Sequence, residues 1–286
     1  MRPCSTLRRL VGRLTLPALA AGLVIAGATP ASAAPGSAEP AAPDRSVRVM
    51  SYNIHAGTSS DNRLDLARIA QEIRSSDADI VGLQEVDRHW NERSVFADQA
   101  AELAGMLQMH VVYGADLDRD PLNPGEPRRQ YGNAILSDAP IQEWRNTLLP
   151  RTGDLEQRGL LEALVRVRSV SVRFCTTQLQ HDSQQERIEQ IAAIREIIGV
   201  SQEPVVVTGD LNAPPDTPEI KALTEDLADA WVQAGVGPGY TYPALNPNAR
   251  IDYVMHTDDL VVRTAAVLGT DGSDHLPMIA DLAPAG

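Results

Sequence analysis

The sequence contains very little cysteine and almost no lysine. Among its 286 residues there are two cysteines, Cys4 and Cys175, and one lysine, Lys221. Cysteine and histidine do not cluster as ligands, so we expect no structural zinc site. Acidic residues outnumber basic ones by 38 to 25, which gives a formal net charge of −13. Because affinity for a phosphate backbone depends on basic side chains, this balance argues against a general polyanion-binding protein.

The first 33 residues have the pattern of an export signal. Four arginines precede an apolar stretch over residues 14–28, and Ala31-Ser32-Ala33 provides the small residues of a cleavage site. The apolar stretch is short for a membrane span, so we expect cleavage, secretion and no stable membrane insertion, with a retained N-terminal anchor as the alternative. Because the segment contains four arginines and no acidic residue, cleavage changes the formal net charge from −13 to −17. It also removes Cys4, which excludes an intramolecular disulfide.

The rest of the chain is consistent with one domain. Residues 34–45 are rich in alanine, proline, glycine and serine, which is typical of a flexible tether. Strand-like and helix-like patterns then alternate over residues 46–284 without a second linker or an internal repeat. No exposed amphipathic seam indicates assembly, so we expect a monomer.

Hydrophobic periodicity predicts a mixed α/β domain with two packed sheets. A strand over residues 47–54, a helix with apolar positions at 66, 69, 70 and 73, and a strand over 78–85 form a β-α-β unit. Residues 115–130 are predicted to be a long, proline-rich loop. Short connections within residues 132–179 favour antiparallel strands. The further expected helices cover 96–107 and 188–198, and the further strands cover 109–113, 132–137, 141–149, 160–167, 170–179, 204–208, 250–255, 260–267 and 277–282.

Polar motifs follow several predicted strands, where open α/β sheets place their functional sites. Each motif is weak by itself, but together they form a specific set. They are Ser51-Tyr52-Asn53-Ile54-His55, Gln84-Glu85-Val86-Asp87, Gly209-Asp210-Leu211-Asn212, Arg250-Ile251-Asp252-Tyr253-Val254 and Ser273-Asp274-His275-Leu276-Pro277.

This set, in this order, resembles the endonuclease/exonuclease/phosphatase superfamily, which includes deoxyribonucleases, abasic-site nucleases, inositol-phosphate phosphatases and neutral sphingomyelinases. The resemblance covers residues 46–283. It implies a four-layer α-β-β-α sandwich of two mixed sheets flanked by helices. It also implies divalent-metal-dependent hydrolysis of a phosphate ester.

The residue types suit that chemistry. A phosphate ester is already anionic, so its hydrolysis needs a positive group and a water aimed in line with the leaving group. Carboxylate and amide oxygens are hard ligands, which favours Mg²⁺ as the cofactor, with Mn²⁺ or Ca²⁺ as alternatives.

The resemblance implies a role for each matched residue. Glu85 is the predicted metal ligand, and Asn53 either orients it or shares the ion's shell. Asp210 is expected to position the attacking water or the metal. Asn212 is expected to donate to a non-bridging phosphate oxygen, and Asp274 is a second carboxylate near the metal.

His275 is the predicted base or transition-state donor, and Asp252 is expected to hold it in its working tautomer. In an extended strand Asp274 and His275 would point to opposite sides, so we expect an irregular turn fixed by Pro277.

One position departs from the family pattern. The family commonly has Thr-His-Leu at the end of a central strand, whereas this chain has Thr177-Gln178-Leu179. Glutamine donates a hydrogen bond but does not transfer a proton, and general-acid help is typically worth ~10²- to 10⁴-fold. His181, three residues further on, is the candidate replacement, with metal-bound water as another.

Further candidates lie near these motifs. His55 is predicted to line the pocket, and Arg129 to contact a substrate phosphate, with a solvated surface arginine as the alternative. Trp231, Tyr240 and Tyr242 suggest an aromatic wall for a cationic head group, although core packing and loop anchoring is the preferred interpretation.

Charge favours a small substrate. A mature charge near −17 repels a nucleic-acid polyanion but only weakly repels a single phosphodiester. The leading hypothesis is a secreted, metal-dependent phosphodiesterase acting on small or lipid-derived phosphodiesters, such as glycerophosphodiesters or phospholipid head groups. The alternatives are a secreted nuclease, a phosphomonoesterase, or a binding protein whose turnover was lost with the change at Gln178.

Overall fold

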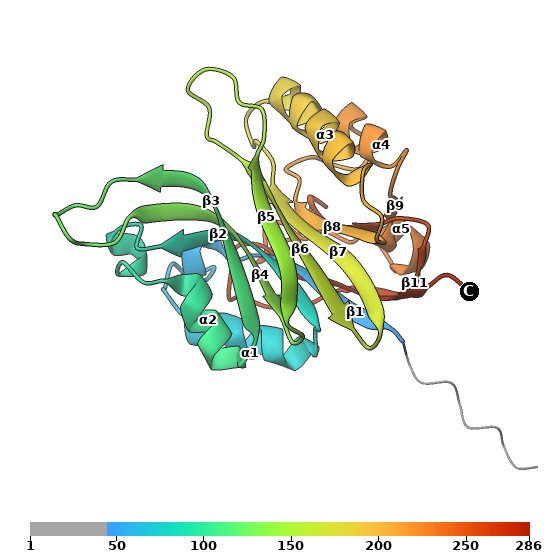
Figure 1. Ribbon diagram of the computed structural model, residues 1–286, viewed down its shortest axis with the longest axis horizontal. Helices are drawn as coiled ribbons and strands as arrows, with labels where there is room; N and C mark the ends of the chain where they lie inside the picture. The colour runs from blue at the N-terminus through green and yellow to red at the C-terminus, as the bar shows by residue number, and fades with distance from the viewer. Residues whose placement is uncertain (1–44) are drawn as a thin grey trace, which may run out of the picture. The chain divides into compact units, whose positions relative to one another are not determined.

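The computed structural model describes residues 45–286, which form two packed six-stranded sheets with helices outside them (Figure 1). The predicted export signal and almost all of the predicted tether lie outside these residues. Within residues 45–286 no helix is long and apolar enough to span a membrane.

The first sheet has the strand order β11-β12-β1-β2-β4-β3. Strands β1 and β2 are parallel and the other neighbours are antiparallel, so the sheet is mixed. Helix α1 (Leu66–Ser76) connects β1 to β2, which confirms the predicted β-α-β unit. The strands are β1 (Val47–Asn53), β2 (Ile80–Arg88), β3 (His110–Arg119), β4 (Arg129–Ser137), β11 (Leu260–Val267) and β12 (Met278–Pro284).

The second sheet has the order β5-β6-β7-β8-β10-β9. Here β7 and β8 are parallel, joined by helix α3 (Gln184–Ile198), and the other neighbours are antiparallel. The strands are β5 (Ile141–Leu148), β6 (Gly159–Val167), β7 (Val170–Gln178), β8 (Val205–Asp210), β9 (Ala228–Asp229) and β10 (Asp252–His256).

The remaining helices are short. They are α2 (Gln99–Leu107), α4 (Pro218–Leu223), α5 (Ala230–Ala234) and the 3₁₀ turns η1 (His55–Gly57) and η2 (Glu92–Ser94).

Apolar side chains divide the domain into layers. One cluster, including Val49, Phe174 and Val206, fills the space between the sheets. A second cluster packs α1 and α2 on the first sheet, and a third packs α3 and α4 on the second, as the placement of these helices in Figure 1 shows. The α-β-β-α sandwich is therefore confirmed.

Two predictions about the middle of the chain are wrong. The strand expected over residues 109–113 continues to Arg119, because cross-strand pairing with β4 provides hydrogen bonds beyond the core. The loop predicted over 115–130 is correspondingly shorter. The antiparallel pairing expected within residues 132–179 is confirmed, since β4 pairs antiparallel with β2 and β3, and β6 pairs antiparallel with β5 and β7. The chain crosses from the first sheet to the second after β4.

Arg250 and Asp229 form an ion pair buried beside the second sheet. Arg250 Nη1 lies 2.7 Å from Asp229 Oδ2, and both side chains are almost fully buried. Loss of one partner leaves the other charge buried and uncompensated.

We therefore expect Arg250→Met to lower the free energy of unfolding by about 3–5 kcal/mol. The measurement is urea-induced unfolding. The control is Arg195→Met, which removes ion pairs to Glu225 and Asp226 that are partly open to solvent, and it should cost less than about 1 kcal/mol. Equal losses in the two variants would contradict the role assigned to burial.

Candidate active site

The two parallel strand pairs bring their carboxyl ends together across the sandwich. Asn53 ends β1, Glu85 lies near the end of β2, Gln178 ends β7 and Asp210 ends β8. Asn53 Nδ2 donates to Asp210 Oδ2 at 3.1 Å, and Gln178 Nε2 donates to Glu85 Oε1 at 2.8 Å. Each of these hydrogen bonds joins one sheet to the other.

A pocket of about 340 Å³ lies over these strand ends. It brings together most of the predicted site residues, from segments as far apart in the chain as His55 and His275. The polar and aromatic side chains that line it are His55, Glu85, Tyr131, Glu156, Arg158, Gln178, His181, Asp210, Asn212, Tyr242, Asp274 and His275.

Glu85 is turned toward the pocket by an irregularity in β2. Its φ is 57°, and the pairing register with β4 shifts between Leu83 and Val86. Burial alone raises the pKa of Glu85, but hydrogen bonds from Asn53 and Gln178 outweigh it and hold the pKa below its ordinary value. The side chain is therefore a carboxylate at neutral pH.

His275 and Asp252 form the predicted pair. His275 Nδ1 lies 2.9 Å from Asp252 Oδ2, and His275 Nε2 lies 3.9 Å from Asp210 Oδ2. Burial lowers the pKa of His275, but Asp252 and Asp210 outweigh it and raise the pKa to about 10. Burial also raises the pKa of Asp210, to about 6, against the opposing effect of His275. The imidazole is thus a cation at neutral pH.

The segment that carries Asp274 and His275 is irregular, as predicted. Ser273 Oγ donates to the backbone oxygen of Asn53 at 2.7 Å and accepts from the backbone of His275 at 3.2 Å. Regular structure resumes only at Met278, one residue after Pro277.

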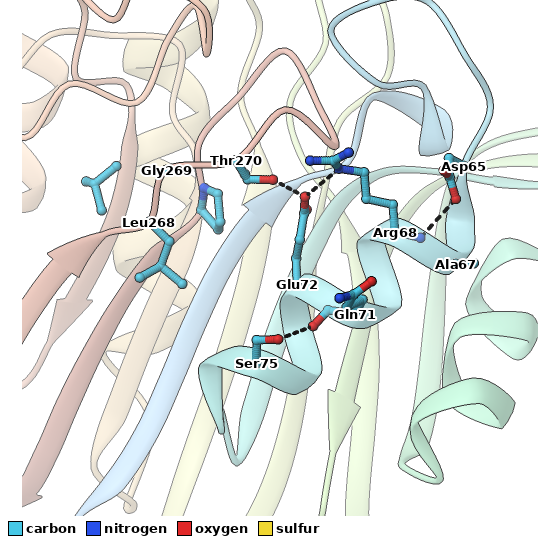
Figure 2. A pocket seen from close by; sticks show the side chains of 11 residues that line it. Asp65, Ala67, Arg68, Gln71, Glu72, Ser75, Leu268, Gly269 and Thr270 are labelled. Carbon is cyan, nitrogen blue, oxygen red and sulfur yellow. Dashed lines mark hydrogen bonds and ion pairs between the residues drawn. The ribbon is translucent and has the colours of Figure 1, made fainter.

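Helix α1 holds this segment from its other side. Glu72 accepts hydrogen bonds from Thr270 Oγ1, from Arg68 Nε at 3.1 Å and from the buried Tyr52 hydroxyl at 2.7 Å. Figure 2 shows Glu72 between Thr270 and Arg68, at a cavity of about 800 Å³ between α1 and residues 267–277. None of the predicted site residues lines that cavity.

Asn53 orients Glu85 by a hydrogen bond from the neighbouring strand β1. Its side chain is fully buried and donates to Glu85 Oε1 at 2.9 Å, while its Oδ1 accepts from the backbone of His55. Of the two roles implied for Asn53, the geometry favours orientation over ligation.

Two groups of donor atoms could hold a divalent cation. Atoms of Asp210, Asp252 and His275 lie within 4.8 Å of one another, and the two carboxylates are the donors of this group, because a protonated imidazole has no lone pair to offer a metal. Asp252 Oδ1 is buried without a hydrogen-bond partner among the described residues. Glu85 and Asp274 line the pocket with oxygen donors, which suit a hard cation that keeps part of its water shell. The donor chemistry therefore fits a divalent metal.

Three further predicted residues, Asn212, His55 and His181, line the pocket at different distances from solvent. Asn212 Nδ2 donates to the backbone oxygen of Leu179 at 3.0 Å, which leaves one amide hydrogen for a substrate. His55 Nδ1 lies 3.6 Å from Asp274 Oδ1 at the pocket wall. The side chain of His181 is 64% exposed at the rim.

Arg129 does not reach this pocket. Its Nε donates to the backbone oxygen of Asp120 at 2.9 Å, and it lines a separate cavity with His89 and Phe96. The extended β3–β4 hairpin carries Arg129 away from the strand ends. The prediction of a phosphate contact in this pocket is therefore not supported by the geometry.

Sequence reasoning missed Arg158, which occupies the pocket instead. Its side chain is almost fully buried, and Nη1 contacts Gln178 Oε1 at 2.6 Å and Glu156 Oε1 at 2.9 Å. The signal available in the sequence was its position directly before strand β6, at the same edge of the sheet as the other motifs.

Tyr242 was assigned to core packing and loop anchoring, and the core-packing part of that assignment is wrong, since the residue is 37% exposed. Its ring lies 4.7 Å from the imidazole of His275, centroid to centroid, and it lines the pocket. The residue lies in a long loop, whose path the sequence pattern did not reveal.

The sandwich and its acidic, imidazole-bearing pocket define a phosphoester hydrolase of the metal-dependent class. The sequence profile of the Endonuclease/Exonuclease/phosphatase family matches residues 50–275, and the chain belongs to that family. Members of the family are phosphoesterases that depend on divalent metals. A comparison with curated proteins found no match.

Solved structures of the family have the same fold. An endonuclease/exonuclease/phosphatase from Beutenbergia cavernae is 28% identical, with a TM-score of 0.74 over 85% of this chain and 72% of that one. The mannosyl-6-phosphatase of Bacteroides thetaiotaomicron is 19% identical, with a TM-score of 0.66 over 83% of this chain and 99% of that one. The D. rerio TDP2 complex with a single-strand DNA product is 18% identical, with a TM-score of 0.60 over 84% and 99%.

The metal-binding role predicted for Glu85 can be tested without an activity assay. A ligand that binds only the folded state stabilises it by about 2.7 kcal/mol at one hundred times its Kd. We expect Mg²⁺ to raise the melting temperature of the wild type in a concentration-dependent way, and Glu85→Gln to lose most of that rise. The control Glu143→Gln removes an exposed carboxylate from β5 and should respond like the wild type. An undiminished Mg²⁺ response in Glu85→Gln would exclude Glu85 as a ligand.

Proposed function

We propose that this protein is a secreted, Mg²⁺-dependent phosphodiesterase that hydrolyses small or lipid-derived phosphodiesters, such as glycerophosphodiesters or phospholipid head groups. The observation that carries the proposal is the convergence of the Asp252–His275 pair, Asp210 and Glu85 on one pocket. A volume of about 340 Å³ lies at the small end of ligand pockets and suits a head group. Among the described residues, the only arginine that lines this pocket is Arg158, which is paired with Glu156.

The proposed chemistry follows from the positions of the donors and acceptors. Glu85 and Asp274 would hold Mg²⁺, and the bound ion would neutralise charge on the non-bridging oxygens of the phosphate. Asp210 Oδ2 accepts the proton of the attacking water. Because His275 Nε2 is 3.9 Å from Asp210 Oδ2, too far for a direct hydrogen bond, both groups are free to face water and substrate.

The remaining contacts bind the phosphate. The Nε2–H group of the His275 imidazolium donates to a non-bridging oxygen as charge builds on it. The free amide hydrogen of Asn212 donates to another. Asp252 keeps the ring of His275 in place through its 2.9 Å hydrogen bond.

A phosphomonoesterase is the second candidate. One solved relative is a mannosyl-6-phosphatase, and a small pocket suits a sugar phosphate as well as a diester. The strongly acidic chain remains the argument against a nuclease.

The substrate proposal is tested with the full chain, Mg²⁺ and a panel of glycerophosphodiesters, phosphomonoesters and duplex DNA. We expect hydrolysis of at least one glycerophosphodiester. Asp210→Asn should lower kcat/KM by about 10²-fold or more, because it removes the base. Asp258→Asn, at an exposed position, is the matched control and should retain activity.

Other outcomes select the alternatives. Faster hydrolysis of monoesters would favour the phosphomonoesterase. DNA cleavage that falls steeply with salt, with an inert diester panel, would identify a nuclease. No hydrolysis of any ester would favour a binding protein.

Secretion forms a separate part of the proposal. We infer cleavage after Ala33, from the order of arginines, apolar stretch and small residues. N-terminal sequencing of protein recovered from the culture medium should begin at Ala34. Recovery of uncut protein in the membrane fraction would overturn this inference and favour a retained anchor.

A further inference from the structure

The hydrogen-bond partners of Gln178 allow only one orientation of its carboxamide. Its Oε1 accepts from Arg158 Nη1 at 2.6 Å and from the Tyr131 hydroxyl at 3.5 Å. Its Nε2 donates to Glu85 Oε1 at 2.8 Å and Asp210 Oδ2 at 3.3 Å. Exchange of the two atoms would set an amide donor against the guanidinium and an oxygen against two carboxylates, so the flipped orientation is excluded.

This arrangement uses every hydrogen of the amide. Two carboxylate oxygens accept the two amide hydrogens, and Gln178 as a whole is 5% exposed. A carboxamide also has no proton to transfer at neutral pH. Gln178 therefore holds Glu85 and Asp210 in place but cannot protonate the leaving group.

The pocket contains only one imidazole that is fixed in position. His275 is held by Asp252, next to Asp210. His55 lies 3.6 Å from Asp274, and His181 lies 3.9 Å from Asp182, both beyond hydrogen-bond distance. Neither ring is oriented for proton transfer as His275 is.

His275 lies beside Asp210, the base of the proposed reaction, with its Nε2 3.9 Å from Asp210 Oδ2, so His275 lies on the side of phosphorus from which the water attacks. The attacking oxygen and the leaving oxygen lie on opposite sides of phosphorus. In the proposed reaction a P–O bond to water forms, the proton of that water passes to Asp210, and the other P–O bond breaks. Its electron pair departs with the leaving oxygen, which is released as an anion and takes its proton from solvent.

We propose that Gln178 makes leaving-group acidity the basis of substrate selection, so that the enzyme prefers diesters with an acidic leaving alcohol and breaks the ester bond on that side. The preferred class includes phenolic esters and alcohols acidified by a nearby cationic nitrogen, as in amino-alcohol head groups. This inference rests on the proposed function. It assigns Gln178 the role of a positioning residue that sets specificity.

The test is a series of methyl aryl phosphodiesters whose phenols differ in acidity, extended by one dialkyl diester. We expect the wild-type log(kcat/KM) to fall steeply as the leaving group becomes less acidic. Gln178→His places an imidazole beside Glu85, which creates a second imidazole–carboxylate pair. It should flatten the slope, with a gain of about 10²- to 10⁴-fold for the poorest leaving group and little gain for the best.

Two controls separate this effect from a general change in the fold. Gln185→His adds an imidazole at an exposed position of α3 and should keep the wild-type slope. His181→Ala should also keep it. A steeper slope in His181→Ala would identify His181 as the proton donor and overturn the inference.

The dependence of the wild-type log(kcat/KM) on leaving-group acidity tests the inference even if Gln178→His fails to fold. A shallow wild-type slope would overturn the inference while leaving the phosphodiesterase proposal intact. Hydrolysis of no ester by either wild type or variant would overturn both.

Discussion

Hydrogen bonds from two buried amides hold together carboxylates that would otherwise repel each other. Asn53 and Gln178 both donate to Glu85 and to Asp210, and each pair of bonds joins the two sheets. Without these donors, two acidic groups at adjoining strand ends would favour protonation or separation. The amides allow a concentration of negative charge that can accept a cation, and the rest of the site is arranged around it.

The fold supplies this arrangement at the edge where two parallel strand pairs end. Backbone geometry there is unusual, since His55, Glu85 and Asn212 all have positive φ values. Such conformations cost free energy and persist where surrounding contacts impose them. Here they aim side chains into the pocket, while α1 holds the segment that carries His275.

Gln178 links the architecture to the chemistry. The amide that holds the carboxylates of Glu85 and Asp210 in position also occupies the position where the family commonly has a histidine. The hydrogen bond from Arg158 fixes the orientation of the Gln178 amide. The amide in this orientation both stabilises the two carboxylates and leaves no transferable proton at position 178. In the proposed reaction, substrate preference therefore follows the acidity of the leaving group.

The sequence by itself determined the β-α-β opening, the paired apolar sheets and the strand-end motifs, because these depend on local periodicity and residue type. Glu85, Asp210 and His275 were predicted from those motifs and do converge on one pocket. Only the tertiary structure decided that β4 belongs to the first sheet while β5, β6 and β7 belong to the second. It also decided that Arg158, and not the predicted Arg129, lines the pocket over the strand ends. Strand pairing and loop paths depend on contacts between distant segments, and those contacts leave no periodic pattern in the sequence.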